Sequence, residues 1–386
     1  MSDKLRVLEV CNLDRFAASP YMLPFFRELA ERGHEVHVAC RVTSFRETLE
    51  GAGLAVHDIP ITRSVTPLAD LGAYRRLKAL IREGGFDLVH THNPKDGVLG
   101  RLAAWKLGVR AVVHTCNGFY FSHRSGRLRK NLVLAAERFA GKRCHLIIFV
   151  NAEDLALAAA KKVVAPTRAR LIHNGVDLER FRPGDDGGLR EELGIPADAT
   201  VIGYIGEIRR EKNLDTLVEA AARLLPAHPR LWLVLVGDHF LEPREHERLA
   251  ELAAGTSPPL PLVFTGYRFD PERFYRAFDI YVLPSSREGF GVTLIEAMAS
   301  GVPVIACDVR GPREIVEDGR DGILVRDRDP AALAEALEFY LQAPRAVENY
   351  TRRARRKVER DFDHARMRAR LFEEYRRLTG NHAPPR

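Results

Sequence analysis

Short hydrophobic runs and amphipathic segments alternate from the start of the chain. Runs rich in β-branched and other apolar residues predict buried strands, and the segments between them have the spacing of helices. In the first half, strands are predicted at 5–10, 35–40, 55–59, 87–91, 111–115 and 146–150, with helices at 20–32 and 44–52. Strands that alternate with helices predict a parallel, doubly wound sheet.

A second series of strands follows a stretch rich in Gly, Pro and Asp at 181–188, which is typical of a linker. The predicted strands are 201–206, 231–236, 262–265, 280–283 and 302–306, and a long charged helix is predicted over 346–378. A chain of 386 residues exceeds one ordinary core. We therefore expect an α/β protein of two Rossmann-like domains, 1–183 and 184–361, facing a central cleft. A helix at 362–380 is expected to pack back on the first domain.

The most informative local pattern lies between a predicted strand and a predicted helix at 284–299. Residues 284–291 read Pro-Ser-Ser-Arg-Glu-Gly-Phe-Gly, so Glu288 and Glu296 bracket a glycine turn and the first turns of a helix. Such a turn presents main-chain N–H groups at a strand's carboxyl end, which suits a diphosphate. Alternatively, Glu288 complements the helix dipole and Glu296 is a solvated helix residue.

Residues 288–303 resemble the E-x7-E signature of retaining glycosyltransferases of family 4, and the resemblance extends over most of the chain. It implies the GT-B architecture and transfer of a sugar from a nucleotide-sugar, expected to be UDP-linked, to a glycan or lipid-linked saccharide in bacterial polysaccharide or glycoconjugate biosynthesis. By this resemblance Glu288 binds hydroxyls of the transferred sugar as a catalytic residue, and Glu296 binds the ribose. The same turn adds five donor-binding candidates: Gly289, Phe290, Gly291, Thr293 and Leu294.

A second donor loop is predicted after the strand at 201–206. Gly206 permits a tight turn, and Lys212 matches the family's phosphate-binding lysine. The family's arginine is replaced by Glu207, and Arg209 or Arg210 can reach the same oxygens. The alternative is that these cations are solvated loop residues.

The turn at 266–268 is the third predicted donor segment. By the resemblance, the backbone around Gly266, Tyr267 and Arg268 contacts the base of the donor. Tyr267 equally fits a half-buried rim aromatic that contacts no ligand.

On the acceptor side, Asn117 stands where many family members have a histidine, and we predict a catalytic role for it. An amide donates a hydrogen bond but cannot act as a base, which is compatible with a leaving phosphate that takes the proton. Alternatively, Asn117 caps the turn before Gly118. The other acceptor-binding candidates are Asp14, Arg15, His92, Lys95, Phe119 and Arg124.

Cofactors and metals are not expected. His90 and His92 form an H-x-H pair of the kind that binds zinc, but no third ligand is evident, and no D-x-D motif stands out. The absence of G-x-G-x-x-G and of G-K-[ST] argues against a nicotinamide enzyme and a P-loop protein.

The net charge of +7 comes largely from clusters at 123–130 and 352–357. No nucleic-acid-binding signature is present, and acidic residues interleave the second cluster, which favours a solvated helix face. The segment 119–130 mixes aromatics with cations and suits an anionic membrane surface, although a solvated loop fits it equally. The chain has no long apolar run, its cysteines are scattered (Cys11, Cys40, Cys116, Cys144, Cys307), and we expect no signal peptide. We expect a cytoplasmic protein that docks on the inner face of the membrane.

Two other functions fit parts of the sequence. A UDP-sugar 2-epimerase also uses two Rossmann-like domains, but it needs carboxylate bases that the sequence does not place. A non-catalytic nucleotide-sugar sensor is favoured by the departures at Glu207 and Asn117.

Overall fold

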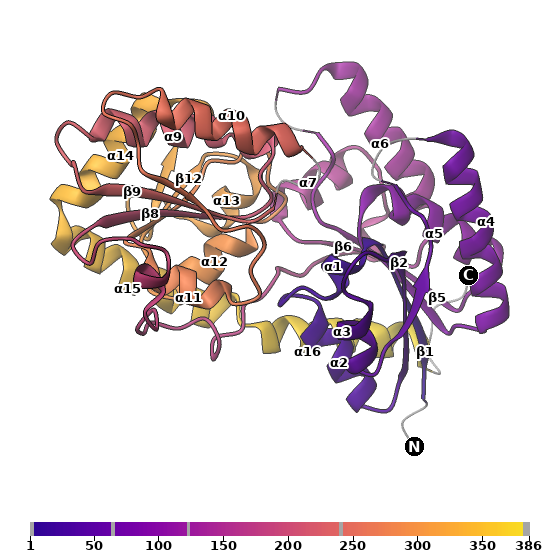
Figure 1. Cartoon of the computed structure of the whole chain (residues 1–386). Helices are drawn as coiled ribbons and strands as arrows, with labels where there is room; N and C mark the ends of the chain where they lie inside the picture. The colour runs from indigo at the N-terminus through magenta and orange to yellow at the C-terminus, as the bar shows by residue number, and fades with distance from the viewer. Residues whose placement is uncertain (1–3, 63–65, 122–123, 239–241, 381–386) are drawn as a thin grey trace. The chain divides into compact units, whose positions relative to one another are not determined.

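The computed structural model describes residues 4–62, 66–121, 124–238 and 242–380. The chain forms two compact units, which Figure 1 shows as two sheets with helices on their faces. One unit contains the residues up to Asn174 and those from Arg366 onward, and the other runs from Gly175 to Ala365. The predicted α/β class is confirmed. The division lies after Asn174 and Ala365, whereas the sequence placed it after residues 183 and 361.

The first unit contains a seven-stranded parallel sheet in the order β3-β2-β1-β4-β5-β6-β7. Strand order reverses between the neighbours β1 and β4, and the carboxyl edge at such a switch point is the usual ligand site in open α/β sheets. The strands are β1 (Arg6–Leu13), β2 (Glu35–Arg41), β3 (Ala55–Asp58), β4 (Leu88–Thr91), β5 (Ala111–Cys116), β6 (Leu146–Phe149) and β7 (Ala169–Leu171). The helices are α1 (Asp14–Ala17), α2 (Leu23–Glu31), α3 (Arg46–Gly51), α4 (Pro67–Gly84), α5 (Pro94–Lys106), α6 (Arg127–Gly141), α7 (Ala152–Ala160) and α16 (His364–Thr379).

Two apolar layers cover the two faces of this sheet. One layer joins α2, α3 and the C-terminal α16, and the other joins α4, α5, α6 and α7. Although α16 is the last helix of the chain, it packs beside α2, with the rings of Phe372 and Phe25 at 5.3 Å (Figure 1). The first unit therefore needs the C-terminal segment to complete its core.

The second unit contains a six-stranded parallel sheet in the order β10-β9-β8-β11-β12-β13, with its switch point between β8 and β11. The strands are β8 (Thr200–Ile205), β9 (Leu231–Val236), β10 (Leu262–Phe264), β11 (Ile280–Leu283), β12 (Val304–Cys307) and β13 (Ile323–Val325). The helices are α8 (Leu189–Glu192), α9 (Leu214–Leu224), α10 (Pro243–Ala254), α11 (Pro271–Ala277), α12 (Val292–Ala299), α13 (Arg310–Ile315), α14 (Pro330–Gln342) and α15 (Pro344–Asp361). The sequence missed β13, because three apolar residues are too short a run to predict a strand.

The stretch 346–378 is helical as predicted, but the structure divides it into α15 and α16, and α16 corresponds to the helix predicted at 362–380. The Asp363 carboxylate accepts a hydrogen bond from the N–H of Ala365 at 2.8 Å. Main-chain hydrogen bonds join Val176 to Phe362 and to His364 on either side of the break. Within the described residues, no helix combines the length and apolar character needed to cross a membrane.

Candidate active site

Two loops that the sequence singled out meet at the carboxyl edge of the second sheet. They follow β8 and β11, the neighbouring strands at its switch point. The N–H of Ser286 donates to the carbonyl of Glu211 at 3.1 Å, and the side-chain amide of Asn213 donates to the carbonyl of Pro284 at 3.1 Å. The segments 206–213 and 284–291 therefore form one polar site within this unit.

The centre of this site is an ion pair between Lys212 and Glu288. The Lys212 Nζ lies 2.8 Å from Glu288 Oε2, and the two side chains are 21% and 19% exposed. Partial exposure leaves both groups accessible to a ligand while limiting how strongly water screens their charges. A diphosphate that binds Lys212 competes with the Glu288 carboxylate, so anion binding releases Glu288 to accept hydrogen bonds from hydroxyl groups.

Glu207, which replaces the family's arginine, pairs with the nearby cation Arg209. The Arg209 guanidinium lies 3.1 Å from Glu207 and 2.5 Å from Glu211, which also pairs with Arg287 at 2.8 Å. Arg209 is 15% exposed, whereas Arg210 is 78% exposed. Of the two predicted substitutes, Arg209 is the one that carboxylates hold in the site. The sequence did not single out Glu211 or Arg287, since neither matched a motif.

The glycine turn before α12 has the geometry that the sequence predicted. Gly291 caps the helix with φ +102°, a conformation that glycine adopts readily and other residues do not. Gly289 and Thr293 are half-buried on this turn. The side chains of Phe290 and Leu294 are 3% and 0% exposed. These two residues can therefore contribute to a ligand site only through their main chain.

Glu296 lies inside the second unit and is 8% exposed. The Tyr275 hydroxyl donates to its Oε2 at 2.7 Å, and burial raises the pKa of the Glu296 carboxyl to about 7. The alternative of a solvated helix residue is therefore wrong. Tyr275 was not predicted, because it lies 21 positions from Glu296 and on another helix.

The glycine turns after β8, β9 and β10 pack main chain against main chain. The N–H of Gly237 donates to the carbonyl of Gly266 at 2.9 Å, and a Cβ on Gly237 would lie 1.8 Å from the oxygen of Gly206. Tyr267 beside this edge is 38% exposed. The Arg268 guanidinium binds both oxygens of Asp270 at 2.9 Å, so its main chain is the part that remains for a base contact.

In the first unit, the loops after β4 and β5 are joined through Asn117. Its side-chain amide donates to the carbonyl of His92 at 2.6 Å. Lys95 forms an ion pair with Asp70 and donates to the hydroxyl of Thr62 at 2.6 Å. Two other predicted acceptor residues remain at the surface: Arg15 is half-buried and Arg124 is exposed.

Two predicted acceptor residues have structural roles instead. Asp14 is fully buried and accepts hydrogen bonds from the N–H and hydroxyl of Thr43, both at 2.6 Å, and from the N–H of Phe45 at 3.0 Å. Phe119 is 4% exposed and stacks on the buried Phe121 at 5.6 Å. Neither side chain is therefore accessible to an acceptor. Part of the predicted membrane segment, at 122–123, lies outside the described residues.

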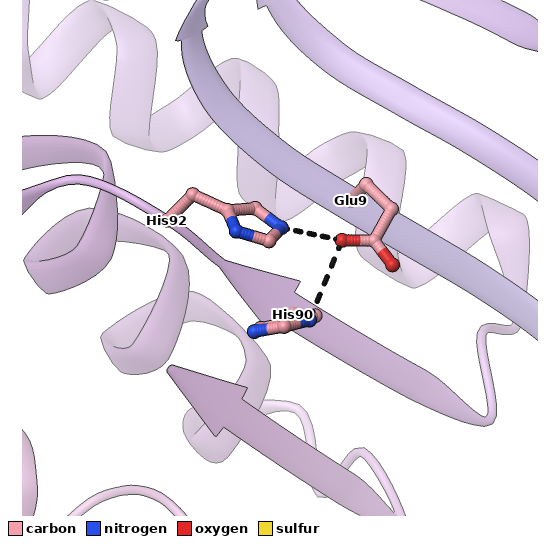
Figure 2. A group of neighbouring side chains, drawn as sticks. All are labelled: Glu9, His90 and His92. Carbon is pink, nitrogen blue, oxygen red and sulfur yellow. Dashed lines mark hydrogen bonds and ion pairs between the residues drawn. The ribbon is translucent and has the colours of Figure 1, made fainter. Parts of the chain in front are cut away.

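A third group does lie beside the histidine pair, contrary to the expectation from sequence. Figure 2 shows Glu9 on β1 with one oxygen directed at His90 and His92. The distances from Glu9 Oε2 are 2.6 Å to His92 Nε2 and 3.5 Å to His90 Nδ1. The ligand atoms of the three residues lie within 4.8 Å of one another, so the trio could hold a metal ion.

The register of the sheet explains this cluster, because β1 and β4 are neighbours and Glu9 stands opposite His90. All three side chains are buried. The hydroxyl of Tyr375 on α16 donates to Glu9 Oε1 at 2.9 Å, so both carboxylate oxygens already accept hydrogen bonds from the protein. This network fastens α16 to the sheet.

The fold is that of GT-B glycosyltransferases. The structure is similar to that of Anabaena Alr3699/HepE in complex with UDP and glucose, with a TM-score of 0.82 and 20% identity over 96% of this chain and 99% of the other. This likeness shows the fold and confirms the predicted architecture of two Rossmann-like units.

Family models match both units. The model for glycosyl transferases group 1 matches residues 186–357, and the model for glycosyltransferase family 4 matches residues 19–180. Bacillus subtilis (strain 168) EpsD is 35% identical over 334 residues, covering 84% of each chain. The UDP-Gal:alpha-D-GlcNAc-diphosphoundecaprenol alpha-1,3-galactosyltransferase of Escherichia coli is 29% identical over 317 residues, covering 81% of each chain. The chain belongs to glycosyltransferase family 4 and is a transferase enzyme.

Proposed function

We propose that this protein is a retaining glycosyltransferase that moves a sugar from a UDP-sugar to a glycan or lipid-linked saccharide. The observation that carries the proposal is the ion pair of Lys212 and Glu288 at the switch point of the second sheet, beside the N-terminus of α12. The E. coli relative supports a UDP-sugar donor and a diphosphate-linked lipid acceptor, because its name contains both. UDP bound in the Anabaena structure supports the same nucleotide.

Each side chain of the donor site has a role in this reaction. As the bond to the anomeric carbon breaks, negative charge collects on the nucleoside diphosphate, and Lys212, Arg209 and the N-terminus of α12 stabilise it in place. Glu288 accepts hydrogen bonds from the sugar, and Glu296 accepts them from the ribose. The leaving phosphate takes the proton of the acceptor hydroxyl, so no protein base is needed. Asn117 supplies hydrogen bonds on the acceptor side.

A donor panel tests this function directly. The purified protein is incubated with UDP-, GDP- and ADP-sugars, with and without undecaprenyl-diphosphate-linked saccharides, and nucleotide release is measured. We expect release from UDP-sugars alone, with a product whose anomeric proton coupling in NMR matches that of the donor. An inverted product would contradict retention. An epimerised sugar formed without acceptor identifies the epimerase, and donor binding without release identifies the sensor.

Donor affinity is expected to rise with pH through neutrality. Burial raises the pKa of Glu296 to about 7, and ribose hydroxyls donate best to its ionised form. If binding needs the carboxylate, the apparent Kd for the intact UDP-sugar is about tenfold higher at about pH 6 than at about pH 8. Calorimetric titration of wild type and Glu296→Gln measures this, and the variant is expected to show a flat profile. A pH-dependent Kd in both proteins would remove Glu296 from the donor site.

We propose that transfer requires no metal ion, because Lys212 and Arg209 already provide positive charge for the leaving diphosphate. Excess EDTA is expected to leave the rate of nucleotide release and the melting temperature unchanged. The Glu9–His90–His92 cluster has the spacing of a metal site, so it is the part of the described structure at which this expectation is tested. If EDTA lowers the melting temperature of wild type but not of Glu9→Gln, the cluster holds a structural metal. If EDTA lowers only the rate, and a divalent cation restores it, the metal acts in transfer.

A lipid-linked acceptor would place the reaction at the inner face of the cell membrane. We therefore propose that the protein works in the cytoplasm and docks peripherally on an anionic lipid surface. Two aromatic side chains of the predicted docking segment, Phe119 and Phe121, are buried, so these rings are not part of an exposed docking surface.

A further inference from the structure

Helix α6 carries apolar side chains on its solvent-facing side. Leu128, Leu132 and Phe139 are 74%, 62% and 51% exposed. At about 100° per residue, these three positions lie within a narrow wedge of the helix surface. Residues on the opposite side, including Leu134 and Ala140, are buried in the core of the first unit. Because a surface helix usually turns only its polar side outward, the outer face of α6 (Leu128, Leu132 and Phe139) requires another explanation.

Cations flank this outer face, and exposed carboxylates are missing from it. Residues 124–143 contain seven basic residues and one acidic residue: Arg124, Arg127, Arg129, Lys130, Arg138, Lys142, Arg143 and Glu137. Glu137 points into the core and pairs with the buried Arg101 at 2.8 Å. The Arg143 guanidinium lies over the ring of Phe139 at 3.8 Å. An apolar stripe bordered by long basic side chains is the pattern of helices that lie in the headgroup region of a bilayer.

A second helix on the same face of the sheet adds to this surface. Helix α4 exposes Leu68 and Leu71 near its start, at 88% and 45%. Helices α4 and α6 both contact α5, which lies in the same layer (Figure 1). Both helices follow strands of a parallel sheet, so both begin at its carboxyl edge. Exposed leucines therefore occur at the starts of two helices on one edge of the first unit.

We propose that the outer face of α6 is the surface through which this protein binds an anionic lipid bilayer. The helix lies along the headgroup region, Leu128 and Leu132 enter the acyl boundary, and the flanking cations contact lipid phosphates. The purpose of this docking rests on the proposed function, because membrane binding would bring the enzyme to a lipid-linked acceptor. The binding itself requires neither donor nor acceptor.

The test is co-sedimentation of the full chain with vesicles, in the absence of substrates. We expect binding to vesicles with about one third phosphatidylglycerol, and at least about tenfold weaker partition to pure phosphatidylcholine. Raising the salt from about 0.05 M to about 0.5 M should weaken the binding by a similar factor. The double variant Leu128→Asp/Leu132→Asp should lose at least about tenfold in partition, because charge replaces the inserted side chains.

Matched controls lie on the second unit. Phe339→Asp replaces another exposed aromatic, which is 41% exposed, and Arg352→Glu/Arg356→Glu reverses charges in the other basic cluster. Both controls should bind vesicles as the wild type does, whereas Arg127→Glu/Arg129→Glu should not. Equal melting temperatures and equal nucleotide release in solution would show that the α6 variants are folded and active.

Several outcomes would overturn the proposal. If Leu128→Asp/Leu132→Asp binds vesicles as well as the wild type does, the docking surface lies elsewhere. If the wild type does not bind anionic vesicles at low salt, the protein has no such docking surface. A wild-type dimer that this variant converts to monomer, without vesicle binding, would make the surface a contact between two copies of the chain. Failure of the donor panel with intact vesicle binding would reject the proposed UDP-sugar donor and keep the docking surface.

Discussion

Replacing Lys212 with methionine is expected to lower kcat/KM for the donor by about a hundredfold to a thousandfold. The substitution keeps the length of the side chain but removes the charge that faces the developing negative charge of the leaving diphosphate. It also leaves Glu288 without its ion-pair partner at 2.8 Å. Nucleotide release at fixed acceptor concentration measures the effect. The melting temperature reports separately on folding.

The same loop provides the control. Arg210 is 78% exposed, so Arg210→Met is expected to change kcat/KM less than about threefold. Glu288→Gln should also reduce turnover, and the double variant Lys212→Met/Glu288→Gln should lose less than the product of the single effects, because the two groups contact each other. A Lys212→Met enzyme within threefold of wild type would remove the lysine from the donor site. Purely multiplicative effects would show that the ion pair is not part of the machinery.

Truncating Arg101 to alanine is expected to lower the free energy of unfolding of the first unit by about 3–5 kcal/mol. The Arg101 guanidinium is fully buried between α5 and α6, where it pairs with Glu137 at 2.8 Å and donates to the carbonyl of Gly97 at 2.8 Å. Without it, the Glu137 carboxylate remains in the core with its ion-pair partner removed. Urea unfolding followed by circular dichroism measures the change.

Two further variants separate the destabilisation caused by a buried charge without its partner from the net contribution of the ion pair to the free energy of unfolding. Arg101→Met/Glu137→Leu removes both charges and fills similar volume, so it should lose less than Arg101→Ala alone. Arg46→Ala breaks an exposed pair with Glu50, whose side chains are 42% and 48% exposed, and should cost about 0.5 kcal/mol or less. If Arg101→Ala lowers the free energy of unfolding no more than Arg46→Ala does, the buried ion pair contributes no more stability than an exposed pair.

The sequence predicted the local geometry of the loops after β8 and β11 better than the surroundings of the candidate residues in the first unit, and the reason is local. A glycine turn between a buried strand and a helix dictates its own backbone, so Gly291 and Lys212 could be placed from their neighbours in the chain. The acceptor candidates had no such constraint. Asp14 begins the short helix α1 and Phe119 lies in a loop, and only packing against distant segments decides that both side chains are buried.

Burial also decided the chemistry of individual groups. Nothing in the sequence distinguishes a solvated Glu296 from one that accepts a hydrogen bond from Tyr275, so the rise of the Glu296 pKa to about 7 followed only from the fold. Likewise, the H-x-H pair lacked a visible third partner because Glu9 lies more than eighty positions earlier and Tyr375 lies at the far end of the chain.

By itself, the sequence determined the order of most strands and helices, the α/β class, the family and the glycine turns after β8 and before α12, because each depends on residues within a few turns of one another. The tertiary structure decided which of these residues meet: Lys212 with Glu288 across 76 positions, Glu9 with its histidines, and the last helix with the first sheet. It also turned Leu128 and Leu132 of α6 outward. Contacts of this kind depend on strand order and helix orientation, which a linear pattern of apolar and polar residues does not record.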